Sequence, residues 1–337
     1  MIRDFFFYKF QFVIIAYFVL VCYSIKDILH PEAFMRELTY LQQKILKANS
    51  RCELRLSEPM RKHTSFRIGG DAEVMAFPKN TEELKVILDL SRFLDCHCRI
   101  LGAGTNVLAP DEGLEGIVIC LKDGLDAMEQ LDDNRILVGA GVTMTRCALF
   151  AASLGLSGLE FAHGIPGTVG GGVYMNAGAY GGEICQVCES VTAMDLEGNI
   201  KNYTGAEMDF SYRHSALEDS GEIVLSAVFT LGKAPVNQIK DKMKELSERR
   251  KASQPLDLPS AGSAFKRPSQ GYAAALIQDC GLKGYRVGGA GISEKHAGFA
   301  VNLGGATASD VRTLLNDVAH VVMEQTGIQL EPEVRIW

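Results

Sequence analysis

Short runs of β-forming residues alternate with glycines through the middle of the chain, from about residue 63 to residue 231. Runs of this kind, bounded by turn-forming residues, predict β-strands. The turn signal Asp-Leu-Glu-Gly at residues 195–198 predicts a hairpin. The expected strands cover residues 72–77, 98–101, 116–121, 135–138, 191–195 and 223–231.

Apolar residues at helical spacing predict helices between and after these strands. One begins after Asn80, where Glu83 completes a capping box, and continues to residue 94. Because this helix lies between two β-rich runs, it favours a βαβ-like unit. Further helices are expected over residues 35–45, 143–153, 236–251, 272–280 and 307–325, and residues 331–337 are expected to be strand-like.

Residues 232–236 interrupt the β pattern and precede a charged amphipathic helix, so we place a domain boundary there. A length of 337 residues also favours two or three domains. The mixture of many short strands with separate helices predicts an α+β protein.

A strongly apolar segment lies ahead of this pattern. Residues 5–25 hold 18 apolar residues in 21, interrupted by Lys9, Gln11 and Ser24. This length is near the ~20 residues that span a bilayer, so a signal anchor is one interpretation. We prefer the other interpretation, in which translation begins at Met35 and residues 1–34 are an extension that the chemistry does not use.

Composition and charge exclude several classes of protein. With 47% hydrophobic and 22% charged residues, the chain is neither disordered nor fibrous. A net charge of −7 with scattered Lys and Arg argues against a nucleic-acid binder. Nine cysteines without a compact framework indicate reduced thiols and a cytoplasmic protein. Cys96/Cys98 and Cys185/Cys188 could be halves of zinc sites, but no second half accompanies them, and we expect no metal.

A first glycine-rich loop, residues 101–108, follows an expected strand. Gly102 and Gly104 allow backbone N–H groups to converge on an anion, and Thr105 and Asn106 add side-chain donors. The loop lacks the third glycine of a Rossmann fingerprint. It is therefore interpreted as a diphosphate cradle, with a tight turn between strands as the alternative.

A second loop, residues 164–182, holds eight glycines in nineteen residues. Glycine at this density costs conformational entropy, so it indicates close approach of the backbone to a flat ligand. Thr168 and Asn176 within the loop are candidates for hydrogen bonds to that ligand. The alternative is a packed run of turns.

Three further groups of polar residues are candidates for chemistry. They are Tyr212 with Arg213, Ser263 with Lys266, and Glu333 with Arg335. Spacing alone also allows structural roles: a surface ion pair for Arg213, a loop cap for Ser263 and an edge-strand charge for Glu333.

From about residue 38 to its end, nearly nine-tenths of its length, the chain resembles the UDP-N-acetylenolpyruvoylglucosamine reductase (MurB) family. The short stretch from Tyr212 to Ile223 resembles the compact type II form. Departures from the family are few: Thr105 in place of a usual Ser, Gly172 in place of a usual Ala, and an end at Trp337. The resemblance is carried by motifs at residues 63–70, 101–108, 164–182, 212–215, 254–255, 259–268, 281–284, 293–296 and 331–335.

The resemblance implies two FAD-binding lobes of the vanillyl-alcohol-oxidase type, at residues 35–120 and 121–232, and a smaller α+β substrate-binding domain at residues 233–337. It implies non-covalent FAD and NADPH as co-substrate. The implied catalytic residues are Arg213, Ser263 and Glu333, and the implied substrate-binding residues are Tyr212, Lys251, Lys266 and Arg335. The implied FAD-binding residues are Gly102, Ala103, Gly104, Thr105, Asn106, Gly164, Ile165, Pro166, Gly167, Thr168, Gly170, Gly171, Asn176, Ala177 and Gly178.

The implied reaction reduces an enolpyruvyl ether of a sugar nucleotide with hydride from flavin N5. Charge develops at C2 and at the adjoining carboxylate. Arg213 would hold this charge as a fixed cation, and Glu333 would donate a hydrogen bond if burial raises its pKa. Ser263 would deliver the proton to C2, helped by a neighbouring Lys251 or Lys266.

Two other functions remain open from the sequence. One is an FAD oxidase of the same fold, with flavin attached through a histidine such as His63. The other is a membrane-tethered flavin-binding protein without turnover, suggested only by residues 5–25. The expected partners are a sugar nucleotide and NADPH, with no nucleic acid, and with a membrane only if residues 5–25 are an anchor.

Overall fold

The computed structural model describes residues 52–337. The apolar segment at residues 5–25 and the helix expected over residues 35–45 lie outside the described residues. Within residues 52–337, no helix is both long and apolar enough to cross a membrane.

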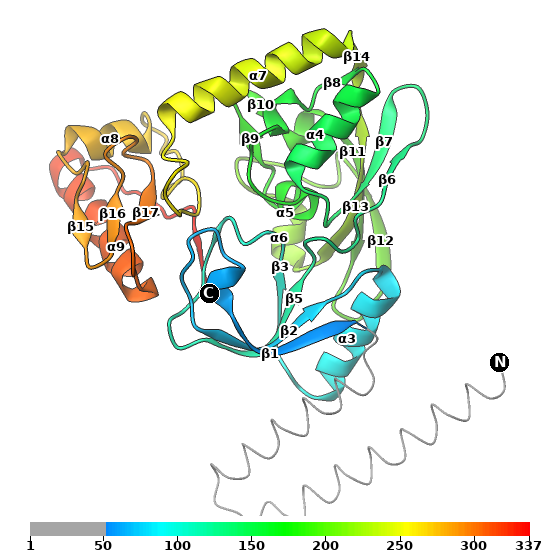
Figure 1. Ribbon diagram of the computed structural model, residues 1–337, viewed down its shortest axis with the longest axis horizontal. Helices are drawn as coiled ribbons and strands as arrows, with labels where there is room; N and C mark the ends of the chain where they lie inside the picture. Colours follow the sequence, from blue (N-terminus) through cyan, green and yellow to red (C-terminus); the bar gives the residue numbers. More distant parts are fainter. Residues whose placement is uncertain (1–51) are drawn as a thin grey trace, which may run out of the picture. The chain divides into compact units, whose positions relative to one another are not determined.

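The first lobe is built on a four-stranded sheet in the order β1-β2-β5-β3 (Figure 1). Strands β2 and β3 both run parallel to β5, and helix α3 (Thr81–Phe93) connects them. The side chain of Asn80 accepts a hydrogen bond from Glu83 N, which is one half of the predicted capping box, whereas the Glu83 carboxylate accepts from Lys79 N rather than Asn80 N. The expected βαβ-like unit is thus confirmed. The strands are β1 (Glu53–Pro59), β2 (Asp71–Phe77), β3 (Cys98–Leu101) and β5 (Leu114–Cys120).

The second lobe contains an antiparallel five-stranded sheet in the order β12-β11-β13-β7-β6. Helices α4 (Met144–Ser153) and α5 (Val169–Tyr174) pack with this sheet around one hydrophobic core. The expected hairpin is present, with a turn in which Gly198 has a φ of 84°. The strands are β6 (Met128–Gln130), β7 (Arg135–Gly139), β11 (Cys188–Met194), β12 (Ile200–Thr204) and β13 (Ile223–Thr230).

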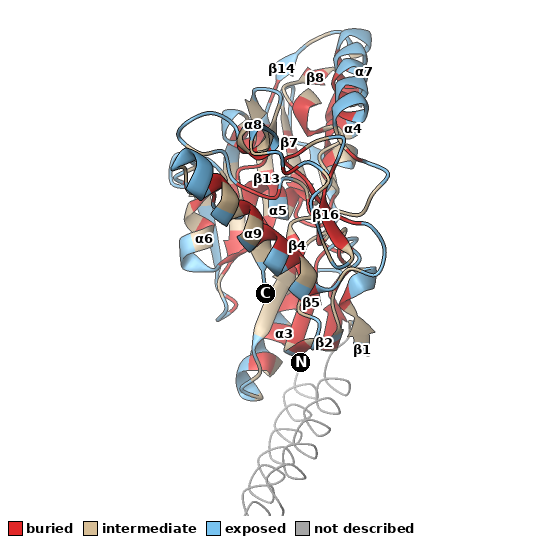
Figure 2. Cartoon of the chain, turned by 90° about the vertical axis from the view of Figure 1, so that its left-hand side faces the viewer, coloured by how far each residue is buried: buried red, intermediate tan, exposed pale blue. Residues whose placement is uncertain are grey.

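Helix α7 (Val236–Ser253) leads from the second lobe to the C-terminal part of the chain. Most of its surface is exposed, and it buries a narrow stripe of Ile239, Met243, Leu246 and Arg250 (Figure 2). The C-terminal part packs α8 (Ala273–Asp279) and α9 (Ala308–Thr326) with the small sheet β15-β16-β17. These strands are β15 (Arg286–Val287), β16 (Ala290–Ile292) and β17 (Ala300–Asn302).

The end of the chain returns to the first lobe, and only Arg335–Ile336 forms a strand, β18. It pairs in parallel with β4 (Val107–Leu108), which follows the first glycine-rich loop. The longer strand predicted over residues 331–337 does not form because the segment changes neighbours. Glu333 N donates to Ala264 O, whereas Arg335 N donates to Asn106 O.

The charged side chain of Glu222 stabilises the start of β13. Its carboxylate is 3% exposed and accepts hydrogen bonds from Lys201 Nζ at 2.5 Å and from the hydroxyl of Tyr203. Burial opposes the charged form, but these two donors outweigh it and lower the pKa of Glu222.

We predict that Glu222→Gln destabilises the protein at pH 7 by about 1–3 kcal/mol, the usual range for hydrogen bonds to a charged group. Because the folded-state pKa is lowered, the stabilisation is present above the unfolded-state value of about 4.3 and is lost as the pH falls through the folded-state value. Chemical denaturation of both proteins from pH 7 to pH 3 measures the difference.

The control for this prediction is Glu197→Gln, a neutralised acid at an exposed position in the neighbouring turn. It should match the wild type at each pH. A difference between wild type and Glu222→Gln that stays constant down to pH 3 would contradict the assignment.

Candidate active site

The first glycine-rich loop, residues 102–106, connects β3 to β4. Gly104 has a φ of +62°, and a Cβ atom there would lie 2.0 Å from His63 O. Its own carbonyl accepts from Ser65 N at 3.0 Å, which fixes the loop against the preceding segment. The amides of residues 102–105 donate to no acceptor in the part of the chain that the structure describes. Consecutive free amides of this kind suit an anion, as the diphosphate interpretation requires.

The second loop contains the short helix α5, whereas the sequence predicts a loop throughout residues 164–182. Thr168 caps this helix by accepting from Gly171 N at 3.4 Å. Several of its glycines are required by packing inside the protein. A Cβ at Gly170 would lie 2.9 Å from the Cβ of Ala140, and one at Gly182 would lie 2.5 Å from the ring of Phe161. Approach to a ligand therefore explains only part of the glycine density.

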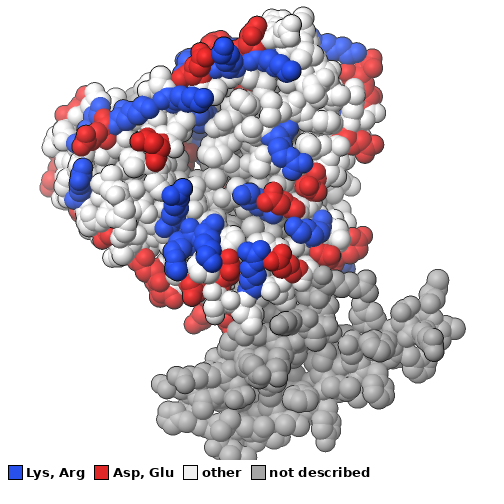
Figure 3. All heavy atoms as spheres, viewed as in Figure 1, with Lys and Arg blue, Asp and Glu red and all other residues white. Residues whose placement is uncertain are grey.

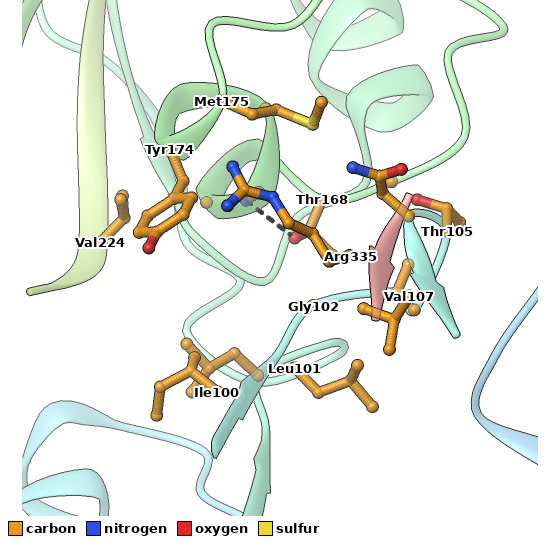
Figure 4. A pocket seen from close by; sticks show the side chains of 18 of the residues that line it. Ile100, Leu101, Gly102, Thr105, Val107, Thr168, Tyr174, Met175, Val224 and Arg335 are labelled. Carbon is orange, nitrogen blue, oxygen red and sulfur yellow. Dashed lines mark hydrogen bonds between the residues drawn. The ribbon is translucent and has the colours of Figure 1, made fainter. Parts of the chain in front are cut away.

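A cavity of about 790 Å³ lies between the two loops (Figure 4). This volume falls in the usual range for small-molecule sites, roughly 300–1,000 Å³. The Gly102–Asn106 loop lines one side, and α5 with the residues before it lines another. The predicted cofactor residues in its wall are Gly102, Ala103, Gly104, Thr105, Asn106, Ile165, Pro166, Gly167, Thr168, Gly170, Gly171 and Ala177.

Three predicted cofactor residues, Gly164, Asn176 and Gly178, do not line this cavity. The side chain of Asn176 is buried, donates to Ser211 O at 2.9 Å and accepts from Cys185 N at 3.0 Å. The side-chain amide of Asn176 therefore holds the loop in place, and its contact with a cofactor stays a prediction.

The structure brings Arg213 and Glu333 together although they are far apart in sequence. Arg213 Nε donates to Glu333 Oε1 at 2.8 Å, and Arg213 Nη2 donates to Gly178 O at 3.3 Å. The Glu333 side chain is only 10% exposed. A charged pair of this kind, close to a cavity, favours a functional role over the surface ion pair considered for Arg213.

Ser263 lies in the segment next to Glu333. Glu333 N donates to Ala264 O at 2.9 Å, so the backbone fixes the serine segment beside the buried carboxyl. Ser263 is exposed, and its hydroxyl has no hydrogen-bond partner within residues 52–337. Arg213, Ser263 and Glu333 do not line the cavity themselves, but Val334 and Arg335 do.

The environment of Glu333 sets its protonation. Burial raises the pKa of the carboxyl, and the opposing effects of Arg213, Lys266 and Tyr212 do not cancel that increase. The group therefore takes up a proton more readily than an ordinary glutamate, even beside a guanidinium.

The four predicted substrate residues are placed differently from one another. Tyr212 is exposed, and its hydroxyl accepts from Arg267 N at 3.2 Å. Lys266 forms an exposed ion pair with Glu331, and the side chain of Lys251 is exposed. Arg335 lies in the cavity wall between the two glycine-rich loops, and its contact with the substrate stays a prediction.

Two charged residues near the cavity, Arg250 and Glu218, are not among the residues that the sequence predicts for the site. Arg250 is buried beside Gly164, and no carboxylate lies within ion-pair distance of it in the described chain. Its place on the buried stripe of α7 was a usable signal, since a charge seldom occupies such a position. Glu218 pairs with Arg335 at 2.6 Å, and nothing in the spacing indicated it.

His63 does not line the cavity. Its ring nitrogen Nε2 lies 2.8 Å from Glu58 Oε1, and its ring packs against Phe77. The structure therefore offers no support for flavin attached through His63.

Comparisons with known proteins agree with this arrangement. The family model of the UDP-N-acetylenolpyruvoylglucosamine reductase C-terminal domain matches residues 254–337, and the FAD binding domain model matches residues 72–204. These matches confirm the expected α+β fold with FAD-binding lobes and a smaller C-terminal domain.

Named relatives cover most of the chain. A UDP-N-acetylenolpyruvoylglucosamine reductase of Agathobacter rectalis is 47% identical over 290 residues, covering 83% of this chain and 92% of the relative. That of Caldanaerobacter subterraneus is 46% identical and covers 84% and 93%. The crystal structure of the Thermus caldophilus reductase is 38% identical with a TM-score of 0.71, covering 85% of this chain and 99% of the other. The chain therefore belongs to the UDP-N-acetylenolpyruvoylglucosamine reductase family.

Proposed function

We propose that this protein reduces the enolpyruvyl ether of UDP-N-acetylglucosamine to UDP-N-acetylmuramate, a step of peptidoglycan synthesis in the cytoplasm. NADPH is the electron donor, and non-covalently bound FAD carries the electrons. The observation that carries the proposal is the partly buried Arg213–Glu333 pair, held beside Ser263 and next to a cavity of cofactor size.

The cavity fits FAD. The free amides of residues 102–105 suit its diphosphate. Gly171 of α5 leaves room for a flat ring system, since only Thr168 Oγ1 lies within 4 Å of a Cβ placed there. Bound FAD would accept a hydride from NADPH and supply it to C3 of the enolpyruvyl group.

Arg213 and Glu333 hold the charge that builds up on the substrate. As hydride reaches C3, electron density moves to C2 and into the carboxylate. Arg213 faces that charge as a fixed cation, while protonated Glu333 donates a hydrogen bond to it. A site that offers both a permanent cation and a neutral acid stabilises the charged transition state more than the ground state.

Ser263 completes the reaction by giving a proton to C2. Its exposed and unpaired hydroxyl is free to approach a substrate, and the bond between Glu333 N and Ala264 O keeps it near the acid. A serine is a weak acid, so a neighbouring cation must stabilise the alkoxide that proton donation leaves behind. Lys266, in the same loop, supports that role.

The substrate's own charges match the surroundings of the site. On the face shown in Figure 3, Lys and Arg side chains lie on both sides of the hollow between the C-terminal domain and the second lobe. Tyr212, Lys251 and Lys266 would contact the sugar nucleotide. NADPH and the sugar nucleotide, both carrying diphosphates, would occupy the same space in turn.

Anaerobic absorbance measurements test the proposed function. The purified protein should show flavin absorbance that NADPH bleaches and that the enolpyruvyl sugar nucleotide restores stoichiometrically. Denaturation should release the flavin into the supernatant. Bleached flavin that only oxygen restores would indicate an oxidase and would contradict the proposal.

Ser263→Ala should leave bleaching by NADPH unchanged and slow reoxidation by the sugar nucleotide by about 10²–10⁴-fold, the usual contribution of a positioned proton donor. Stopped-flow absorbance separates the two half-reactions. The matched control is Ser269→Ala, another exposed serine after the same segment, which should reoxidise at the wild-type rate. Reoxidation of Ser263→Ala at that rate would rule out the proton-donor role.

Glu333→Gln tests the neutral-donor role through pH. Because the donor is the protonated form and its pKa is raised, wild-type reoxidation should slow as the pH increases through that pKa. The amide cannot ionise, so Glu333→Gln should be slower than wild type but should lack this pH dependence, and Glu333→Ala should be slower still. Glu331→Gln, at an exposed acid two residues away, should keep the wild-type profile. An unchanged profile in Glu333→Gln would count against the role.

A further inference from the structure

Two ion pairs join the segment around α6 (Ala216–Ser220) to the end of the chain. In one pair the first segment supplies the cation, and in the other the end of the chain supplies it. Arg213 donates to Glu333 at 2.8 Å, and Arg335 donates to Glu218 at 2.6 Å. Each segment therefore contributes one cation and one anion. The first pair is part of the proposed reaction. In the second pair Arg335 is an expected substrate-binding residue, whereas Glu218 has no assigned purpose.

The second pair belongs to the cofactor cavity. Arg335 and Tyr174 both line the cavity wall, and Figure 4 shows their side chains in the same part of it. Arg335 is 41% exposed, so its guanidinium borders open space as well as Glu218. Glu218 is less exposed, at 25%, and its Oε2 is buried with no hydrogen-bond partner among the described residues.

The structure holds Glu218 firmly in position. Leu217, the preceding residue, is fully buried in the core of the second lobe. Ser215 Oγ donates to Tyr174 O at 2.6 Å, which ties the start of α6 to the end of α5. These contacts fix the backbone on the N-terminal side of Glu218, and its carboxylate contacts Arg335.

The charges of this pair compensate each other. Arg335 is the only basic residue that the described part of the chain places within ion-pair distance of Glu218. Glu218 in turn raises the pKa of Arg335, so the guanidinium stays charged. With Glu218 ionised, the pair adds no net charge to the cavity wall. The same wall also holds Arg99 and Glu222, the latter paired with Lys201. Without Glu218, the positive charge of Arg335 would be added to this wall uncompensated.

We propose that Glu218 is a positioning residue that fixes the Arg335 guanidinium in the cofactor cavity and cancels its charge. The inference rests on the proposed function, because it requires FAD in the cavity. A flavin that takes up a hydride would gain one negative charge, so a positive wall would favour the reduced form. Glu218 thus keeps the midpoint potential of the bound cofactor lower than Arg335 alone would make it.

The test is the two-electron midpoint potential of bound FAD, measured by equilibration with a redox dye. Glu218→Gln keeps the shape of the side chain and an acceptor for Arg335 but removes the charge. It should favour the reduced form by about tenfold, which corresponds to about 30 mV upward for a two-electron couple. Arg335→Gln should shift the potential downward, and the double substitution should return it toward the wild-type value.

Two controls separate this role from a structural one. Asp219→Asn removes a negative charge from the next residue of the same helix, whose side chain is 75% exposed, and should leave the potential unchanged. Glu218→Asp keeps the charge and should stay near the wild-type potential, even where FAD binds less tightly.

The outcomes distinguish the two proposals. A wild-type potential in Glu218→Gln, or an equal shift in Asp219→Asn, would overturn the role of Glu218 and leave the reductase proposal intact. A protein that takes up no FAD would overturn both. An upward shift limited to Glu218→Gln, and reversed in the double substitution, would support the role.

Discussion

The proposed reaction depends on one constraint: a carboxyl with little exposure must lie beside a guanidinium and still accept a proton. The end of the chain meets this constraint by lying between two other segments. Glu333 N bonds to Ala264, Asn106 Nδ2 bonds to Glu333 O at 3.1 Å, and Arg335 N bonds to Asn106. The Glu333 side chain has little freedom as a result, and Arg213 reaches it from a different lobe.

This arrangement explains why the chain needs both flavin-binding lobes and a returning C-terminus. Burial raises the pKa of Glu333, and the neighbouring cations oppose that increase. If Arg213 alone determined the balance, Glu333 would remain ionised and could not donate a hydrogen bond. If burial alone determined it, the site would lack a cation for the developing charge. The backbone hydrogen bonds hold Glu333 where burial raises its pKa and Arg213 lowers it.

The sequence predicted the local features well because local signals determine them. The helix cap at Asn80, the hairpin at residues 195–198 and the long helices follow from short-range preferences. Helix α5 was missed because glycines disfavour helices, and tertiary packing overrides that preference here. The grouping of Arg213, Ser263 and Glu333 came from family motifs and not from spacing. Their proximity depends on backbone bonds between distant segments, which no local pattern reveals. The same reason hid the pairing of Glu218 with Arg335.

The most direct measurement of this balance is an isotope-edited infrared titration of the Glu333 carboxyl in the FAD-bound protein. The band that disappears in Glu333→Gln assigns the signal. The account predicts a protonation midpoint clearly above the ordinary glutamate value of about 4.3. A midpoint at or below that value would mean that Arg213 dominates and that Glu333 is an ionised partner, which would contradict its role as a neutral donor.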